Sequence, residues 1–486
     1  MSNAAIKQAF LWGACWVVAS GCGERPTELA EKQDAGLDAA VDWVAVDAGL
    51  DAGLDAGSDA GACVANPGPG VWTWMSGGAV ALQHGSYGTL GVAEPSNVPG
   101  ARRFAASWVD SLGAFWLFGG WGYGASGQAG YLNDLWKFDG TSWTWVAGAP
   151  TTDQLGAYGR GGRPGARNLA AAWVDHAGAL WLFGGLGFGE SGAEGYLDDL
   201  WKFDGTGWTW VGGAVVPDQQ GLYRDGGSPG ARTSPAVWVD SRGTWLFGGR
   251  GHGDGPGVGD LNDLWRFDGT GWTWVGGGTT ASDALGVYAP KGIADAGALP
   301  GGMQLSASWS GQASTLWLFG GDEAGLQGST NDLWKFDGTN WTWVTGSGPL
   351  ALGAAGSYGE QGTADPANTP GSRRASVSWA DPCGNLWLAG GYGWASKQGD
   401  ANGPGPLSDV WKFDGTSWAW ISGSRFVDQP GSYGGGGDGA TEDTPGARYG
   451  AASWADRNGG VWVFGGLGID STGAQGELND LWRYQP

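Results

Sequence analysis

Five arginines recur at one position of a repeated pattern, where a Pro-Gly-x-Arg segment leads into a run of small residues. They are Arg102, Arg167, Arg232, Arg373 and Arg448, and a sixth copy of the segment has Met303 instead. A guanidinium group binds carboxylate, sulfate or phosphate through two parallel hydrogen bonds. Five such groups around one opening would form a site for an acidic ligand, and we therefore predict that these arginines bind ligand.

The same pattern allows a second interpretation of these arginines. Each repeat that has the arginine also has an aspartate that could pair with it, namely Asp134, Asp199, Asp263, Asp409 and Asp480. An arginine that is removed from water needs an anionic partner whether or not a ligand is present. The sequence leaves open whether the arginines face a ligand or form ion pairs within the repeats.

Five aromatic residues closely follow glycine pairs, in surroundings too rich in glycine to bury them well. They are Trp121, Tyr123, Phe188, Tyr392 and Trp394. Exposed aromatic rings favour binding of carbohydrate or peptide, so we predict these five as ligand-binding residues. The alternative is that the rings only cover the ends of the sheets.

Residues suited to known catalytic or metal centres are sparse. The 486 residues include three His and four Cys, and no phosphate-binding loop, nucleophile elbow or HExxH motif occurs in the sequence. We expect no metal and no cofactor. The formal net charge of -23 would repel a phosphate backbone, which argues against nucleic acid as a partner.

The elements that must position these residues come from a sequence repeated six times. Its clearest copy contains PGARNLAAAWVD (164–175), LWLFGG (180–185), LDDLWKFDG (197–205) and WTWV (208–211). The second of these runs, LWLFGG, is one of six counterparts along the chain, whose glycine pairs begin at Gly119, Gly184, Gly248, Gly320, Gly390 and Gly465. Each copy holds four short runs with strand patterning and none has a helical period. The sequence therefore predicts an all-β protein made of four-stranded units.

The ends of the repeat array predict how these units are joined. The last copy stops at 481–486 without a fourth strand, while VWTW at 71–74 is a fourth strand without a unit. Pairing of the two would remove open sheet edges, a recurrent hazard of all-β folds. We predict a six-bladed β-propeller over residues 71–486, in which the N-terminal strand completes the last blade.

The glycine pair, the following (N/D/S)D(L/V)W and the closing Trp resemble kelch repeats, although these copies exceed the kelch length of about 50 residues. The resemblance implies a propeller of four-stranded blades. Some kelch domains hold acidic peptides with arginines at this place, and the family includes a sialic-acid mutarotase. The copper site of galactose oxidase is not matched, because His84, His176 and His252 lie in different units and Cys383 is the one Cys of the repeat region.

The first 70 residues predict targeting and a tether. Residues 1–22 have the apolar core of a signal peptide and end in Ala-Ser-Gly-Cys, which resembles a lipobox, so we predict lipidation of Cys22. An ordinary secretory signal and a short uncleaved anchor are the alternatives. Residues 23–70 are rich in Asp, Ala and Gly with a net charge of -8, which predicts a disordered acidic linker.

Two further expectations complete the prediction. A disulfide between Cys63 and Cys383 would fasten the linker to the propeller in an oxidising compartment. We predict a monomeric lipoprotein of the bacterial cell envelope, at the periplasmic face or cell surface, whose propeller binds an acidic small molecule, a glycan or a protein. Its membrane contact would be through the lipid anchor alone. The alternatives are a secreted protein, a surface scaffold, and an enzyme that acts on an acidic sugar at the channel mouth.

Overall fold

The computed structural model describes residues 70–486 except 225, 282, 324–327, 350, 398–402 and 435–442. The predicted signal segment, the linker up to residue 69, Cys22 and Cys63 lie outside the described residues. Within the described ranges, no helix is long and apolar enough to cross a membrane.

The described residues form strands that follow the sequence repeats, which we number 1 to 6 in chain order. Repeat 1 contains β3 (Arg102–Arg103), β4 (Ala106–Val109), β5 (Phe115–Tyr123), β6 (Ala129–Phe138) and β7 (Trp143–Ala147). Repeat 2 contains β8 (Arg167–Asn168), β9 (Ala171–Val174), β10 (Leu180–Phe188), β11 (Glu194–Phe203) and β12 (Trp208–Gly212). Repeat 3 contains β13 (Arg232–Thr233), β14 (Ala236–Asp240), β15 (Gly243–Gly251), β16 (Gly259–Phe267) and β17 (Trp272–Gly276).

The later repeats are built in the same way, with more irregularity in repeat 4. Repeat 4 contains β18 (Met303–Gln304), β19 (Ala307–Ser310), the 3-10 turn η1 (Gln312–Ser314), β20 (Leu316–Phe319), β21 (Asp322–Glu323), β22 (Gly328–Ser329), β23 (Leu333–Phe336) and β24 (Trp341–Thr345). Repeat 5 contains β26 (Arg373–Arg374), β27 (Val377–Ala380), β28 (Leu386–Gly393), β29 (Gly405–Phe413) and β30 (Trp418–Ser422). Repeat 6 contains β31 (Arg448–Tyr449), β32 (Ala452–Ala455), β33 (Val461–Ile469) and β34 (Gln475–Gln485).

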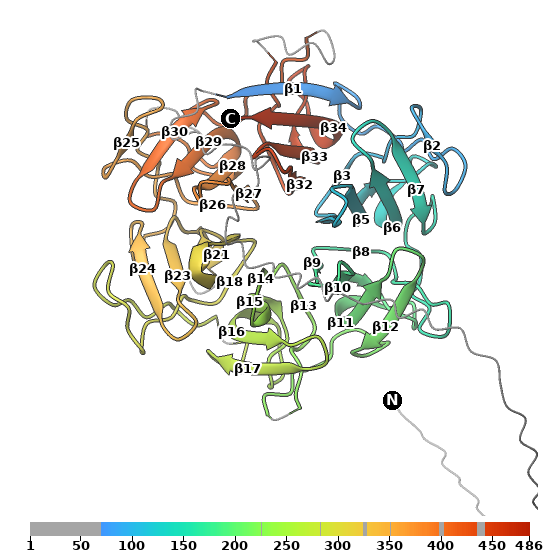
Figure 1. Ribbon diagram of the computed structural model, residues 1–486, viewed down its shortest axis with the longest axis horizontal. Coiled ribbons are helices and arrows are strands. Elements are labelled where there is room, and N and C mark those ends of the chain that lie inside the picture. Colours follow the sequence, from blue (N-terminus) through green and yellow to red (C-terminus); the bar gives the residue numbers. More distant parts are fainter. Residues whose placement is uncertain are drawn as a thin grey trace, which may run out of the picture. The chain divides into compact units, whose positions relative to one another are not determined.

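In repeats 1, 2, 3, 5 and 6, the first two short strands both pair antiparallel with the third strand, and the later strands follow outward in chain order. Repeat 4 is divided into two sheets, one of β18, β21 and β22 and one of β19, β20, β23 and β24. The strand β1 (Val71–Ser76), from the other end of the chain, pairs with β34 and places Val71 opposite Gln485. Figure 1 shows β1 beside β34 at the outer side of repeat 6.

The glycine pairs are needed where one repeat meets the next. Gly119 has φ 65°, a left-handed conformation that favours glycine, and a Cβ there would lie 2.7 Å from the carbonyl oxygen of Arg167 in repeat 2. The same approach recurs in later repeats, and at Gly465 the carbonyl that would be hit belongs to Arg102 of repeat 1. The glycine pair therefore lets the first strand of one repeat, such as β8, pack closely on the third strand of the preceding repeat, such as β5.

The innermost segments of the six repeats are joined by backbone hydrogen bonds, which we call the belt. Its members are Phe104, Leu169, Ser234, Leu305, Ala375 and Gly450, all with positive φ between 52° and 64°. The amide of each donates to the carbonyl of the member in the preceding repeat, and the amide of Phe104 donates to Gly450, with lengths of 2.7 to 3.3 Å. The series therefore returns to its starting residue.

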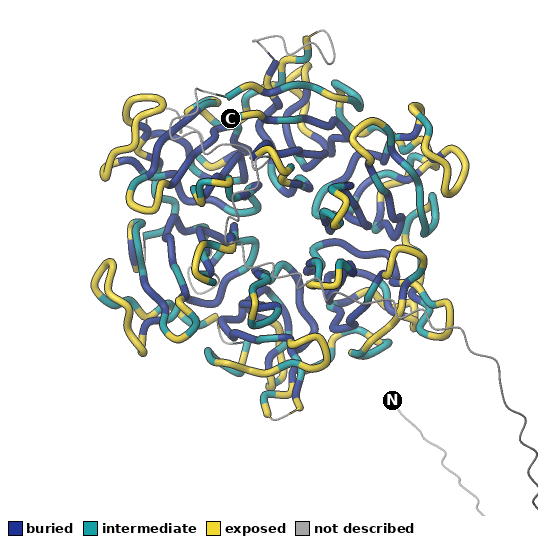
Figure 2. The backbone as a smooth tube through the Cα atoms, viewed as in Figure 1, coloured by how far each residue is buried: buried dark blue, intermediate teal, exposed yellow. Residues whose placement is uncertain are grey.

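The tryptophans fill the space between neighbouring sheets. One buried cluster joins Trp108 and Trp116 of repeat 1 to Trp201 and Trp208 of repeat 2, and similar clusters join the other neighbouring repeats, including repeats 6 and 1. The indole N–H of Trp108 also donates to the carbonyl of Trp181 in the next sheet, over 2.9 Å. Figure 2 shows the strands buried and most turns exposed. Most of the tryptophans in the described ranges are therefore core residues.

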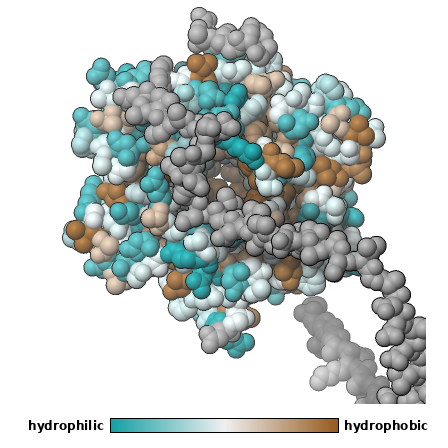
Figure 3. Space-filling view, viewed as in Figure 1, coloured by the Kyte–Doolittle hydropathy of each residue, from teal (hydrophilic) through white to brown (hydrophobic). Residues whose placement is uncertain are grey.

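The described residues thus form an all-β structure of antiparallel sheets that lie around a common centre (Figure 1). The space-filling view is hollowed near that centre (Figure 3). The arrangement is consistent with a β-propeller.

Candidate functional site

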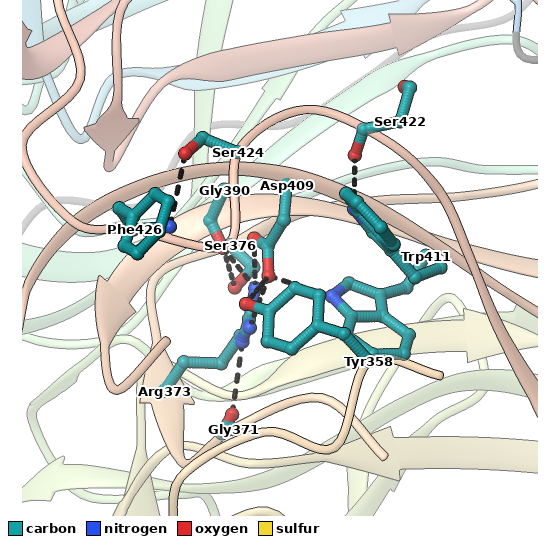
Figure 4. Close-up of polar contacts among 11 residues, drawn as sticks. Tyr358, Gly371, Arg373, Ser376, Gly390, Asp409, Trp411, Ser422, Ser424 and Phe426 are labelled. Atoms are coloured by element: carbon teal, nitrogen blue, oxygen red, sulfur yellow. Dashed lines mark hydrogen bonds and ion pairs between the residues drawn. The ribbon is translucent and has the colours of Figure 1, made fainter. Parts of the chain in front are cut away.

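The five repeated arginines lie in a buried network that is nearly identical in each repeat. In repeat 5, Arg373 forms two parallel hydrogen bonds to Asp409, of 2.6 and 2.7 Å (Figure 4). Its Nε also donates to the carbonyl of Gly371, and Nη1 donates to that of Gly390. The corresponding pairs are Arg102 with Asp134, Arg167 with Asp199, Arg232 with Asp263, and Arg448 with Asp480.

The aspartate of each network is also held by aromatic groups. Asp409 accepts hydrogen bonds from the Tyr358 hydroxyl and from the Trp411 indole N–H, both 2.7 Å long. Trp411 lies two residues after Asp409 on β29, so the alternation of the strand puts both side chains on one face. Burial, together with the neighbouring carboxylate, raises the pKa of Tyr358 well above its ordinary value. The loop tyrosine therefore fastens its loop to the sheet.

This geometry corrects the expectation that the five arginines face a ligand. The exposed fraction of these residues is 0 to 1% in four cases and 6% for Arg448. Each guanidinium group already has a carboxylate, and a ligand would have to displace that partner inside the protein, at the cost of an unpaired buried charge. The structure has the ion pairs that the sequence left as the alternative.

Repeat 4 lacks this network and differs from the others on the same strands. Met303 replaces the arginine. In the pairing of β18 with β21 it lies opposite Glu323, and Glu323 stands where the other repeats have glycine. The aspartate of the repeat, Asp332, keeps its bond from the Tyr288 hydroxyl, at 2.7 Å. Burial without an arginine partner raises the pKa of Asp332. The Trp334 indole N–H has no hydrogen-bond partner among the described residues.

A polar pocket of about 400 Å³ lies where repeat 4 departs from the pattern. Its lining residues come from repeats 3, 4 and 5 and include Arg250, Asp260, Asp283, Gln304, Asp322, Glu323 and Arg374. Arg250 contacts Asp260 at 3.2 Å, and Arg374 forms an ion pair with Asp322. Burial raises the pKa of Asp260 to about 6 and raises the pKa of Glu323. The pocket thus contains paired donors and acceptors together with carboxyl groups that bind protons more readily than usual.

A second opening, of about 200 Å³, is lined by the belt residues and the residues that follow them. The two openings adjoin along the chain, because Gln304 and Arg374 of the polar pocket directly precede the belt residues Leu305 and Ala375. Figure 3 shows the hollow at the centre of the described surface. We call the two openings together the channel mouth.

Two of the five predicted aromatic residues lie in the strands that border the channel mouth. The guanidinium group of Arg103 lies 4.8 Å from the Trp121 ring, and that of Arg374 lies 5.0 Å from the Tyr392 ring. Arg103 also contacts Glu477 of repeat 6 at 3.3 Å. Both rings are half-buried and offer a flat surface beside charged groups.

The other three predicted aromatic residues occupy a position two residues farther along the chain, at or just beyond the end of β5, β10 or β28. Tyr123 stacks on His84, with ring centroids 6.3 Å apart. Phe188 packs edge-on against Tyr131 at 5.8 Å, and Trp394 lies against Gly353. Tyr123 and Trp394 thus lie against loops, while Phe188 lies against a residue of β6 in the preceding repeat.

Sequence reasoning did not find the polar pocket. Asp322 and Glu323 directly follow a glycine pair, at positions where the other repeats have an apolar, aromatic or arginine residue and then glycine. That substitution, in the one repeat without the arginine, was the available signal.

The predicted disulfide falls partly on residues that the structure describes. Cys383 is disulfide-bonded. Its predicted partner, Cys63, lies outside the described residues, so the pairing stays a prediction.

Comparison with known proteins gives no family assignment. No family model matches the chain, and no curated protein matches it. One solved structure, described as "Structure of YjhT", is similar over 79% of this chain and 95% of its own, with 14% sequence identity and a TM-score of 0.48.

Proposed function

We propose that residues 71–486 form a closed six-bladed propeller of kelch type, which works as a binding module for a glycan at the channel mouth. The observation that carries this proposal is the polar pocket at repeat 4. There the otherwise regular structure exchanges a closed ion-pair network for partly exposed arginine and aspartate side chains beside the buried carboxyl groups of Asp260 and Glu323. The proposed closure is supported by the belt and by the pairing of β1 with β34.

The charges around the pocket favour a neutral ligand over an acidic one. Two arginines face four carboxyl groups in its lining, and both arginines already have carboxylate partners. An additional anion would meet an acidic wall. Sugar hydroxyl groups both donate and accept hydrogen bonds, so they can bind to the carboxyl groups and to the arginines at the same time.

Aromatic rings beside the pocket supply the apolar part of such a site. The Tyr392 ring lies against Arg374, which lines the pocket, and contacts Tyr449 with centroids 5.3 Å apart. Ligand sites combine flat apolar surfaces with a few well-placed polar groups that fix orientation. One face of a sugar ring could rest on Tyr392 while its hydroxyl groups reach Asp322 and Asp260.

Glycan-array binding by the full chain, in low and high salt, tests this proposal. We expect neutral glycans to bind with little dependence on salt, and affinity to fall at least tenfold in Asp260→Asn and in Tyr392→Ala. Leu112→Ala is the matched control, because Leu112 is 82% exposed on a turn outside the channel mouth. Salt-sensitive binding of acidic glycans alone, or no glycan binding, would contradict the proposal.

A second candidate function is proton transfer on a bound sugar. It is favoured by the two carboxyl groups with raised pKa, Asp260 and Glu323, in one pocket. A protonated carboxyl group can donate a proton while an ionised neighbour accepts one. Interconversion of sugar anomers followed by NMR, in the wild type and in Glu323→Gln, would separate catalysis from binding alone.

The cellular setting remains part of the proposal. We propose an envelope lipoprotein anchored through Cys22 and an acidic tether, with secretion as the alternative. Metabolic labelling with a fatty-acid analogue, compared between the wild type and Cys22→Ala, tests the anchor.

A further inference from the structure

The outermost strands of the repeats differ in whether another segment covers their free edge. In repeat 1, β2 (Ala93–Glu94) pairs with β7, and in repeat 5, β25 (Ala364–Asp365) pairs with β30. In repeat 4, Asp295 forms a bridge to Trp341 of β24. Figure 1 shows β2 outside β7 and β25 outside β30. Each cover comes from the loop that precedes its own repeat.

The three covers share one sequence pattern and one backbone hydrogen bond. They read Gly-Val-Ala-Glu (91–94), Gly-Ile-Ala-Asp (292–295) and Gly-Thr-Ala-Asp (362–365). In each, the glycine amide donates to the carbonyl of the second Trp in the outermost strand, namely Trp145, Trp343 or Trp420, over 2.7 to 2.8 Å. Each cover therefore consists of a glycine, a β-branched residue, an alanine and an acidic residue, in this order.

The acidic residue of the cover ends the extended segment rather than pairing with a cation. The Asp365 carboxylate accepts a hydrogen bond from the amide of Ala367, and that of Asp295 accepts one from Gly297. Both are short-range turns of the kind that Asp favours. The edge of the sheet thus recognises the extended backbone and the small alanine, with the acid closing the turn.

Repeats 2 and 3 have the same outermost strand but no such cover. Their strands β12 and β17 read Trp-Thr-Trp-Val-Gly and are the last strands of their sheets among the described residues. Trp210 and Trp274 are each 37% exposed, and Val211 and Val275 are each 43% exposed. Figure 2 shows β17 as an exposed stretch at the outer rim.

The chain's own loops before repeats 2 and 3 are shorter than the loops that supply covers. A bridge closes each of these two loops between residues six apart, Ala157 with Arg163 and Leu222 with Ser228, whereas the bridges of the covering loops join residues twelve apart, Ser86 with Val98, Val287 with Leu299 and Ser357 with Thr369. Neither loop contains the cover sequence. A crevice of about 430 Å³ runs beside β17, with Val275 to Gly277 on one side. Its other side is formed by repeat 4, through Gly338 to Trp341 and through residues 295–299 at the end of the repeat 4 cover. It offers room for side chains of a segment that lies along β17.

We propose that β12 and β17 bind an extended segment of a partner protein by antiparallel strand addition, and that this segment has the Gly-(β-branched)-Ala-(Asp/Glu) chemistry of the internal covers. Strand addition satisfies the outward backbone groups, and the side chains give selectivity. Uncovered apolar edges otherwise favour aggregation, which natural β-proteins avoid by covering them. Two adjacent repeats with identical open edges let one partner with two such segments bind at both.

Photo-crosslinking of the full chain with a synthetic peptide tests this proposal. The probe carries two copies of the sequence of residues 89–97, joined by a flexible linker, with a photoreactive group beside each glycine. The matched control replaces both glycines by N-methylglycine, which removes the donor to the Trp carbonyl and leaves the other side chains unchanged. We expect crosslinks within Trp208–Gly212 and Trp272–Gly276, and at least tenfold fewer with the control peptide.

Variants of the exposed positions provide a second measurement. Val211→Lys with Val275→Lys places charges on both open edges, which natural edge strands use to block pairing, and the crosslinks should then disappear while the far-UV circular dichroism is unchanged. Equal crosslinking by both peptides, or none by either, would overturn the proposal. Sedimentation that shows a dimer abolished by the Lys variants would overturn it in favour of a second copy of the chain.

Discussion

Repeats 4 and 5 present the same buried aspartate without and with an arginine partner. In repeat 5, Asp409 is held by Arg373, Tyr358 and Trp411. In repeat 4, Asp332 has Tyr288, the Trp343 indole N–H at 3.2 Å and the Gly348 amide at 2.9 Å, but no arginine. The pKa of Asp332 is raised as a result of its burial.

The difference teaches which part of the repeat is architectural. Where the arginine is present, the strands form one continuous sheet and the network is closed to solvent. Where it is absent, the sheet is divided and a polar pocket adjoins it. We infer that the ion pair keeps a repeat regular, and that its loss leaves room for a binding site.

Giving repeat 5 the methionine of repeat 4 should produce the largest effect. Arg373→Met leaves Asp409 buried without a cation, and breaking a buried pair in this way costs about 3–5 kcal/mol. Urea unfolding followed by Trp fluorescence measures the loss. Arg374→Met is the control, because its half-exposed ion pair is worth at most about 1 kcal/mol. Equal losses for the two variants would show that the buried pair has no special weight.

Replacing Asp409 or Asp332 by asparagine should show a second difference in stability between repeats 5 and 4. Asp409→Asn leaves Arg373 buried without its anion and should cost about 3 kcal/mol. Asp332→Asn removes a carboxyl group that has no arginine partner and whose pKa burial raises, so it should cost less, at most about 1 kcal/mol. Unfolding free energies at pH 7 measure both, and a larger loss for Asp332→Asn would reverse the comparison.

Repeat 2 has an aspartate, Asp198, where repeats 1, 3, 4 and 6 have asparagine. Those asparagines donate to a proline carbonyl of the next repeat, as Asn331 does to Pro370 over 3.2 Å, whereas an ionised aspartate cannot donate. Burial raises the pKa of Asp198 to about 6. Folding raises this pKa, so the folded protein is more stable when Asp198 is protonated. This contribution to the free energy of unfolding is present at low pH and is lost as pH rises from about 4 to about 6.

Asp198→Asn should therefore stabilise the protein by about 1–3 kcal/mol at pH 8 and have little effect at pH 4. Unfolding free energies of the variant and the wild type, measured across this range, test the prediction through their difference. A difference that does not change with pH would contradict the assigned cause.

The smallest effect is expected from the loop tyrosine. Tyr358→Phe removes one hydrogen bond to Asp409, which keeps Arg373 and Trp411, so the cost should be about 1 kcal/mol. Tyr288→Phe removes a hydrogen bond to Asp332, which has no arginine partner, and should cost more. Thermal unfolding of both variants checks the order, which would be wrong if Tyr358→Phe were the more damaging.

The sequence predicted the regular part of the molecule better than its exceptions. Six recurrences of strand-patterned runs were sufficient for the all-β fold, because burial and alternation repeat with them. The partners of the buried pairs were identified by type and position, but the sequence could not decide between an ion pair and a ligand site, since both need an arginine at the same place. That decision depends on side-chain burial, which only the packed structure reveals.

Features formed by a few atypical residues were missed for a different reason. Glu323 and the three Gly-x-Ala-(Asp/Glu) covers were visible in the sequence, but each lies in a segment between the repeated runs. Their meaning depends on which strand edge they meet, and this requires the three-dimensional arrangement of loops and sheets.

The belt has a consequence for how the protein exchanges its amide protons. A row of hydrogen bonds normally has two ends, from which opening spreads inward. The belt joins Gly450 back to Phe104 and so has no end. Opening one of its amides requires that neighbouring repeats separate. The six amides should therefore exchange with deuterium as a group, at a rate set by the opening of the whole ring, which would make them a native reporter of its integrity.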